Sequence, residues 1–180
     1  MKEKINVNEY AQIIMEALGK GGILLNTNGD KFNTMVIGWA GLGRCWNLPV
    51  FTVYVRENRY TKPQIDKTGE FTVSIPLGEI DKNINSVCGS KSGRDIDKVA
   101  EANLMLEDPE VNSTPGIAQY PLTLECKVLY AQRQNPSMLP FEIFKGMYPQ
   151  DKDGSEPMAN RDPHTEYVAQ IVDAYIIGRL

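Results

Sequence analysis

The sequence predicts a mainly β fold, an antiparallel barrel with an N-terminal helix and short helical inserts. Two observations support this prediction. Several segments alternate apolar and polar residues with the period of two that is typical of strands, and the candidate helices between them are short and irregularly placed. A doubly wound sheet would instead alternate strands and helices regularly. A chain of 180 residues is long enough to form one domain with its own core.

The first predicted elements are a helix and a β-hairpin. Asn6 or Asn8 could cap the helix, and the glycines at 21 and 22 would end it. A strand over residues 23–27 then leads into Asn28-Gly29-Asp30, a strong hairpin-turn sequence, and the return strand covers residues 32–40. The apolar face of the helix consists of Tyr10, Ile13, Ile14, Ala17 and Leu18.

Four more strands and three short helices complete the expected barrel. The last strand is apolar on both faces, which is typical of a strand buried between the barrel and another layer, such as a second subunit. Residues 136–163 are rich in Pro, Gly, Met and charges, and we expect them to form a surface loop or interface arm within a single domain of residues 1–180. The strands are predicted over residues 50–56, 70–75, 122–130 and 167–177, and the helices over 63–67, 80–87 and 95–102.

Composition and charge exclude several classes of protein. The net charge is −4, whereas nucleic acids and anionic membranes call for a basic surface, so we expect neither partner. Three cysteines without a CxxC pair predict reduced thiols. With one histidine the chain cannot build a multi-histidine site, and no metal is expected. We find no signal-peptide core and no apolar run of membrane-spanning length, so we expect a cytoplasmic location.

The sharpest candidate for an anion site is the turn at residues 56–61, which follows a strand and precedes a helix. It contains Arg56, Arg59, Tyr60 and Thr61. Two guanidinium groups, a hydroxyl and free N–H groups at a helix start are what a phosphate monoester needs. An exposed charged loop explains the same spacing equally well.

A second candidate for an anion cradle is the loop at residues 88–95. Two glycines, Ser90, Lys91, Ser92 and Arg94 precede a predicted helix there. The alternative is a plain connection between two helices, in which Asp95 caps the second one. The two roles can coexist.

Polar residues inside an apolar strand form a third candidate. Asn33 and Thr34 need hydrogen-bond partners if they are buried, and Met35 and Trp39 lie close to them in the sequence. A flavin ring would suit this set, because it offers donors and acceptors at one edge and an apolar end at the other. Taken alone, these residues favour a half-exposed strand. The lone histidine, His164, precedes the last strand, and such a histidine is more often a structural hydrogen-bonding group than a catalyst.

The order of these motifs resembles that of the flavin reductase-like family, which includes the flavoredoxins. Six blocks carry the resemblance over roughly residues 20 to 178, and their order is more specific than any one of them. The blocks are Asn33 to Trp39, Pro49 to Arg56 with Arg59-Tyr60-Thr61, Glu70 to Ser74, Cys88 to Asp95 with Asp97-Lys98, Pro121-Leu122 with Leu124-Glu125-Cys126, and His164-Thr165 with Tyr167.

The resemblance implies a split β-barrel that binds FMN near the interface of a homodimer. It implies that the phosphate is held by Arg56, Arg59, Tyr60 and Thr61 together with Ser90, Lys91 and Ser92. It further implies that the ring contacts Asn33, Thr34, Met35 and Trp39, and that His164, the candidate catalytic residue, lies near the ring or in the partner's site.

We therefore expect an oxidoreductase that moves electrons from NADH or NADPH through FMN to an acceptor. The alternatives are a flavoredoxin-type electron carrier with redox-protein partners and a non-catalytic ligand-binding barrel. Residues 151–160 match no pattern of the family, so the resemblance implies nothing about them.

Overall fold

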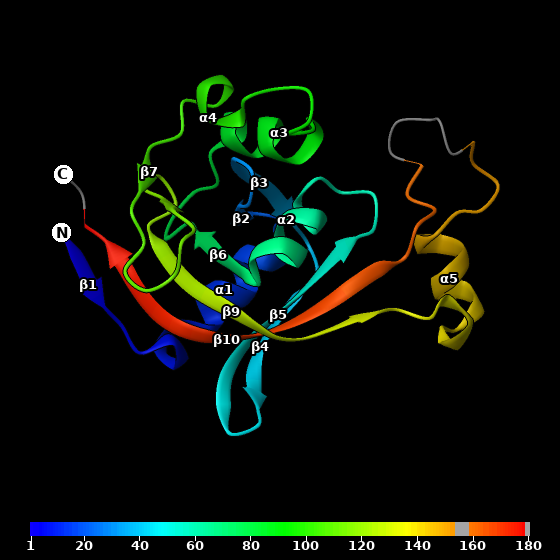
Figure 1. The fold of residues 1–180 in the computed structure, drawn as a ribbon, viewed down its shortest axis with the longest axis horizontal. Helices are drawn as coiled ribbons and strands as arrows, with labels where there is room; N and C mark the ends of the chain where they lie inside the picture. Colours follow the sequence, from blue (N-terminus) through cyan, green and yellow to red (C-terminus); the bar gives the residue numbers. More distant parts are fainter. Residues whose placement is uncertain (154–158, 179–180) are drawn as a thin grey trace.

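One strongly curved antiparallel sheet dominates the computed structural model, which describes residues 1–153 and 159–178 (Figure 1). Within these residues the strand order is β3-β2-β6-β9-β10-β5-β4, with β1 paired to the end of β10. A separate ribbon joins β7 to β8. The strands are β1 (Lys2–Lys4), β2 (Ile23–Asn28), β3 (Phe32–Ile37), β4 (Ala40–Cys45), β5 (Leu48–Arg56), β6 (Glu70–Ile75), β7 (Leu106–Glu107), β8 (Gly116–Ile117), β9 (Leu122–Arg133) and β10 (His164–Ile177).

The sheet curls around a core without closing. Its two edge strands, β3 and β4, follow each other in the chain, but no ladder of hydrogen bonds joins them in the described part of the chain. The predicted mainly β fold, a split barrel with an N-terminal helix and short helical inserts, is confirmed. The helical elements are η1 (Val7–Tyr10), α1 (Ala11–Gly19), α2 (Thr61–Thr68), α3 (Lys82–Ser90), α4 (Lys98–Glu101), η2 (Pro136–Met138) and α5 (Phe141–Met147).

Neighbouring residues of β2 belong to two different cores. Ile23 and Leu25 pack inside the curled sheet against α1, whereas Leu24 between them packs under α3 and α4. Successive side chains of a strand point to opposite faces, so β2 is buried on both. The second core fixes α3 and α4 over β2 and β3, as Figure 1 shows. This position sets the distance between the 88–95 loop and the sheet.

The hairpin of β4 and β5 differs from the prediction. The strand predicted over residues 32–40 ends at Ile37, and β4 begins only at Ala40. The chain then turns back through Trp46 and Asn47, whose φ angles are 48° and 60°. Bulky residues such as tryptophan rarely adopt this left-handed conformation. The turn therefore lacks the sequence signal of a common hairpin, and β4 was missed.

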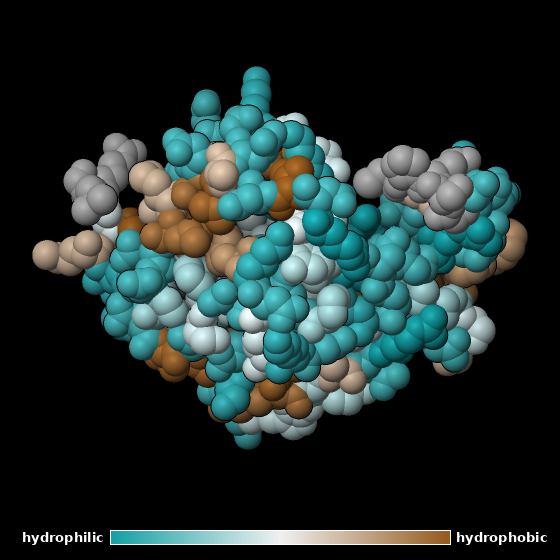
Figure 2. All heavy atoms as spheres, turned by 45° about the horizontal axis from the view of Figure 1, so that its top comes forward, coloured by the Kyte–Doolittle hydropathy of each residue, from teal (hydrophilic) through white to brown (hydrophobic). Residues whose placement is uncertain are grey.

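The ends of β9 and β10 carry a protruding arm, which we define as residues 134–153 and 159–163 (Figure 1). The arm contains η2 and α5, so the stretch predicted as a loop is partly helical. No residue of α5 is buried, and Met138 and Phe141 are 80% and 69% exposed. Figure 2 shows hydrophobic residues at the outer edge of this right-hand protrusion. Residues 154–158, which fall within the predicted loop, lie outside the described residues.

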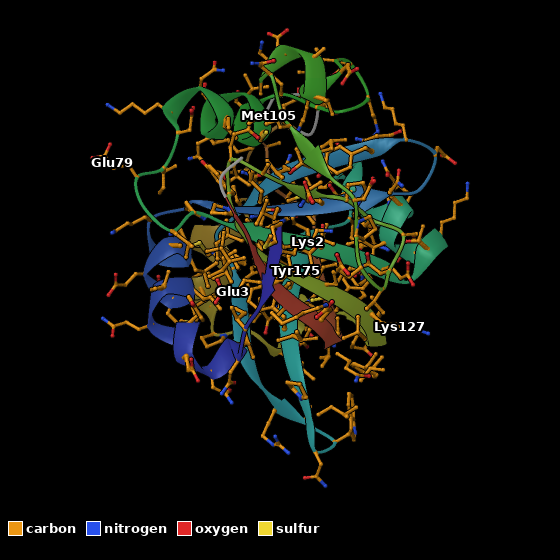
Figure 3. All side chains as sticks on the ribbon, turned by 90° about the vertical axis from the view of Figure 1, so that its left-hand side faces the viewer. Lys2, Glu3, Glu79, Met105, Lys127 and Tyr175 are labelled. Atoms are coloured by element: carbon orange, nitrogen blue, oxygen red, sulfur yellow. The ribbon has the colours of Figure 1, made fainter. Side chains whose placement is uncertain are left out.

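The N-terminal strand β1 lies along the far end of β10. Figure 3 shows Lys2 beside Tyr175, and the Lys2 ammonium lies 4.9 Å from the centroid of that ring. The N-terminus and the end of β10 therefore lie at the opposite side of the molecule from the arm (Figure 1). Within residues 1–153 and 159–178, no helix combines the length and the apolar character that a membrane crossing requires.

Candidate functional site

A cavity of about 640 Å³ opens between β3, the end of β5, the start of α2 and the 88–95 loop. This volume lies within the range of small-molecule and cofactor sites, about 300–1,000 Å³. A second hollow of about 710 Å³ lies beside Met1 and the end of β10, and its lining includes Glu79, Met105 and Glu107. Figure 3 labels the first two of these residues. No lysine or arginine of the described chain lines that second hollow.

The first cavity is strongly cationic. In the described part of the chain, five basic side chains line it and no carboxylate does, although the whole protein carries a net charge of −4. Such an excess of one sign concentrates an anionic ligand. The five are Arg56, Arg59, Lys91, Arg94 and Lys98.

The two predicted anion motifs meet in this cavity. The 56–61 turn leaves the end of β5, and the 88–95 loop leaves the end of α3. Nη1 of Arg94 donates a hydrogen bond of 3.0 Å to the carbonyl oxygen of Asn58, which joins the loop to the turn. The Arg94 guanidinium also lies 5.4 Å from the centroid of the Tyr60 ring. This side of the cavity therefore combines cations with hydroxyl groups.

Arg56 has partners that the sequence did not reveal. Nη1 donates to the carbonyl oxygens of Asn160 and Asp162, both at 2.8 Å, and Nη2 donates to that of Met147 at 2.9 Å. Arg59 reaches the same segment through the side-chain oxygen of Asn160, at 2.9 Å. Arg56 thus ties the arm to the end of β5 while it lines the cavity.

The 88–95 loop is shaped by close packing at Gly93. A Cβ atom built at this residue would lie 2.1 Å from Oδ1 of Asn33 and 3.0 Å from Cδ1 of Tyr60. Only glycine therefore lets the loop approach β3 and the turn so closely. The predicted cap at Asp95 was wrong, because α4 begins at Lys98 and its N-cap is Asp97, whose side chain accepts from two backbone N–H groups.

β3 supplies a wall with unsatisfied polar atoms. Asn33 donates through Nδ2 to Oγ1 of Thr61 at 3.0 Å, but its Oδ1 is buried without a partner. Oγ1 of Thr34 is buried and unpartnered as well, but it does not line the cavity. Buried polar atoms in native proteins are nearly always satisfied, so this wall calls for a ligand or an ordered water. Met35 and Val36 add apolar surface to the same wall.

Lys98 is a buried cation that the sequence analysis did not select. It is 6% exposed, and its ammonium donates to the carbonyl oxygens of Thr34, at 2.8 Å, and Cys88, at 3.0 Å. Burial is the main cause that lowers the pKa of Lys98 to about 8, and Arg59 lowers it further. Tyr54, which also lines the cavity, was missed too.

An aromatic cluster closes the side of the cavity nearest the arm. The rings of His164 and Trp39 have centroids 4.5 Å apart, and the Tyr148 hydroxyl lies 2.8 Å from Nδ1 of His164. The same hydroxyl donates to Gln134 at 2.9 Å. Burial above all, and then the charge of Arg56, lower the pKa of His164 to about 4. At neutral pH this imidazole is uncharged.

The structure brings together eleven of the twelve residues selected from the sequence. The exception is Thr34, whose side chain does not line the cavity and whose carbonyl instead binds Lys98. The eleven are Asn33, Met35, Trp39, Arg56, Arg59, Tyr60, Thr61, Ser90, Lys91, Ser92 and His164.

A comparison with protein families finds that residues 19–177 match the model of the flavin reductase like domain. The chain belongs to this family. The flavoredoxin of Methanosarcina acetivorans is 26% identical, with a TM-score of 0.62 over 86% of this chain and 67% of its own. The flavoredoxin of Desulfovibrio vulgaris (Miyazaki F) is 22% identical, with a TM-score of 0.63 over 86% of this chain and 68% of its own.

A third solved structure covers almost all of this flavin reductase-like chain. It is the FMN-binding domain of a flavin reductases-like enzyme from Shewanella baltica OS155, which is 16% identical, with a TM-score of 0.63 over 98% of this chain and 77% of its own. These likenesses place the chain among split barrels of the flavin reductase type, flavoredoxins included.

The chemistry of the cavity fits a flavin nucleotide. The unpaired Oδ1 of Asn33 suits a ring edge that carries an N–H group, and the apolar and aromatic side chains suit the ring itself. Arginine, lysine and serine side chains suit a phosphate. Among the described residues no group of three or more His, Cys, Asp or Glu side chains could hold a metal ion.

Proposed function

We propose that this protein binds FMN in the cationic cavity and transfers electrons from NADH or NADPH through it to an acceptor. One observation carries the proposal. Five basic side chains and no carboxylate of the described chain line a cavity whose other walls are aromatic, apolar or unsatisfied polar groups. A phosphorylated planar ring needs both parts of this lining, the basic side chains for its phosphate and the aromatic, apolar and polar walls for its ring.

The phosphate would be held where the two loops meet. Arg59, Arg94, Lys91 and the hydroxyl of Ser92 are the donors on this side. Charge-assisted hydrogen bonds to phosphate are about twice as strong as neutral ones. Arg56 already donates three hydrogen bonds to carbonyl oxygens of the arm. Its contribution to phosphate binding is therefore its positive charge.

The ring would lie against β3 and the aromatic cluster. When bound, FMN supplies the capacity to accept a hydride and to pass electrons on. The chain's own residues bind the ring, orient it and exclude water from it. His164 is uncharged at neutral pH, so it contributes as a neutral hydrogen-bonding group and not as an acid.

We also propose that the protein is a homodimer and that the arm lies in the interface. The exposed apolar side chains of the arm support this idea, since Met138 and Phe141 are among the most exposed hydrophobic residues of the described chain. Large exposed apolar patches on a protein usually mark an interaction site. The arm is also bound to the site, through Arg56 and Tyr148, so a subunit that covers it would contact the cavity wall.

The test begins with the visible spectrum of the purified protein and the identity of any flavin that denaturation releases. The protein with its bound flavin is then mixed anaerobically with NADH or NADPH, and the bleaching of the visible flavin absorption is followed. Rapid bleaching supports the oxidoreductase. A flavin that stays oxidised with both donors, but is reduced by a redox protein, favours an electron carrier, as the similarity to flavoredoxins also suggests. A protein that does not bind FMN refutes the proposal.

A further inference from the structure

The most unusual charged group of the molecule is Lys98. This residue lies at the first position of α4, directly over β3, and its side chain turns inward to the cavity. Two of the three N–H groups of its ammonium are used by the carbonyl oxygens of Thr34 and Cys88. One N–H group therefore remains for a ligand in the cavity.

Lys98 has no counter-charge from the described protein. Within residues 1–153 and 159–178, no carboxylate lies within 4 Å of its Nζ, whereas Lys91 of the same cavity is paired with Glu101. A buried charge is costly unless it is paired. The depression of its pKa reflects that cost. A negative charge on a ligand in the cavity would supply the missing counter-charge.

One unsatisfied acceptor of the cavity wall indicates which part of the ligand lies beside Lys98. Oδ1 of Asn33 is buried without a partner, on the same strand as the Thr34 carbonyl that Lys98 binds. A phosphate offers acceptors and cannot satisfy Asn33 Oδ1. The pyrimidine edge of a flavin offers both an N–H donor and carbonyl oxygens, so it matches this wall.

We propose that Lys98 binds the pyrimidine edge of the flavin and is the counter-charge of its reduced form. This inference rests on the proposed FMN site. A hydride from the reduced nicotinamide brings two electrons and one proton to the ring, and the neutral oxidised ring becomes an anion with one negative charge. The nicotinamide is oxidised by the same step. The ammonium of Lys98 binds that anion more tightly than the neutral ring, and this raises the reduction potential of bound FMN.

The experiment compares the reduction potential of FMN bound to the wild type, Lys98→Gln and Lys98→Arg. Gln removes the charge but keeps donors, whereas Arg keeps the charge. We expect Lys98→Gln to weaken the binding of reduced FMN at least tenfold more than that of oxidised FMN, which lowers the potential by about 30 mV for a two-electron couple. Lys98→Arg should retain most of the wild-type potential.

Lys91→Gln is the matched control, because it removes one positive charge from the loop side of the same cavity. It should weaken the binding of oxidised and reduced FMN equally and leave the reduction potential of bound FMN unchanged. Suppose that Lys98→Gln weakens the binding of oxidised and reduced FMN equally and leaves the binding of riboflavin, which has no phosphate, unchanged. Lys98 then binds the phosphate, and the inference is refuted. An unchanged potential in Lys98→Gln refutes it too.

A measurement on the wild type covers the case in which the Lys98 variants fail to fold. Sulfite adds covalently to oxidised flavin and leaves a negative charge on the pyrimidine. We expect FMN in the wild-type protein to bind sulfite at least tenfold more tightly than free FMN does. Equal or weaker sulfite binding refutes the role of Lys98 while leaving FMN binding intact, and a failure to bind FMN at all would refute the proposed function instead.

Discussion

The stability of the apoprotein should fall steeply between pH 7 and pH 5 because of one side chain. His164 is the only histidine of the chain, and it is buried between Trp39, Tyr148 and Arg56. In the unfolded chain its pKa is about 6.5, whereas burial and the nearby guanidinium lower it to about 4 in the folded protein. Between these values the unfolded state binds a proton that the folded state does not.

The sign and size of the effect follow from this difference. Acid favours the state that binds the proton, so the folded state loses stability as the pH falls below about 6.5, and the loss is complete near pH 4. The integrated difference between pH 7 and pH 5 is about 2 kcal/mol, and the full difference is about 3 kcal/mol. Above pH 7 this contribution to stability is complete.

Urea unfolding of the flavin-free protein at pH 5, 6 and 7 measures the effect, with His164→Gln as the control. Gln cannot take up a proton, so the variant should lose about 2 kcal/mol less than the wild type over this interval. The comparison uses the change with pH, so any lost packing in the variant cancels. The reasoning is refuted if the unfolding free energies of the two proteins change equally with pH. It is also refuted if His164 in the folded protein titrates near pH 6.5.

Three further predictions concern the cavity and the arm. Gly93→Ala should destabilise the protein by about 1–3 kcal/mol and weaken FMN binding, because its Cβ meets Asn33 Oδ1, whereas Gly41→Ala, with nothing within 4 Å, should not affect FMN binding. Arg56→Ala combined with Arg59→Ala should weaken FMN binding at least tenfold, because the cavity loses two positive charges and the phosphate loses its hydrogen bond from Arg59, worth about 1.5–3 kcal/mol. The same variant should make the arm more sensitive to limited proteolysis, because the hydrogen bonds of both arginines to Asn160 are lost. An unchanged dissociation constant would contradict the phosphate assignment. Light scattering at micromolar concentration should give the mass of a dimer, and a monomer would contradict the interface proposed for the arm.

Strands were predictable wherever the alternation of residues was regular. Residues 70–75 alternate clearly, and β6 has these bounds. β4 escaped prediction because its sequence, Ala-Gly-Leu-Gly-Arg-Cys, contains two glycines and does not alternate, and because its turn uses residues with unusual φ angles. Such elements are formed by pairing with β5, which no local pattern reveals.

Local patterns identified the site residues that share a loop, whereas Asn33, Met35, Trp39 and His164 were joined to them only by the resemblance in motif order. The 56–61 turn and the 88–95 loop each gather polar groups within a few residues, so each could be recognised. Lys98 could not, since its position in a helix does not say that its side chain turns inward. The contacts of Arg56 were hidden for the same reason, because its partner carbonyls lie 91 to 106 residues later.

Arg56 links three features that look separate in the sequence. Its guanidinium lies at the cavity, donates to carbonyl oxygens of the arm at the end of α5 and just before β10, and by its charge disfavours protonation of His164. The arm in turn supplies Tyr148, which binds the Nδ1 atom of His164. Any partner that displaces the arm must therefore also disturb the aromatic wall of the cavity. It follows that the subunit contact proposed for the arm should be coupled to flavin binding, and that the coupling should be lost when Arg56 is replaced by alanine.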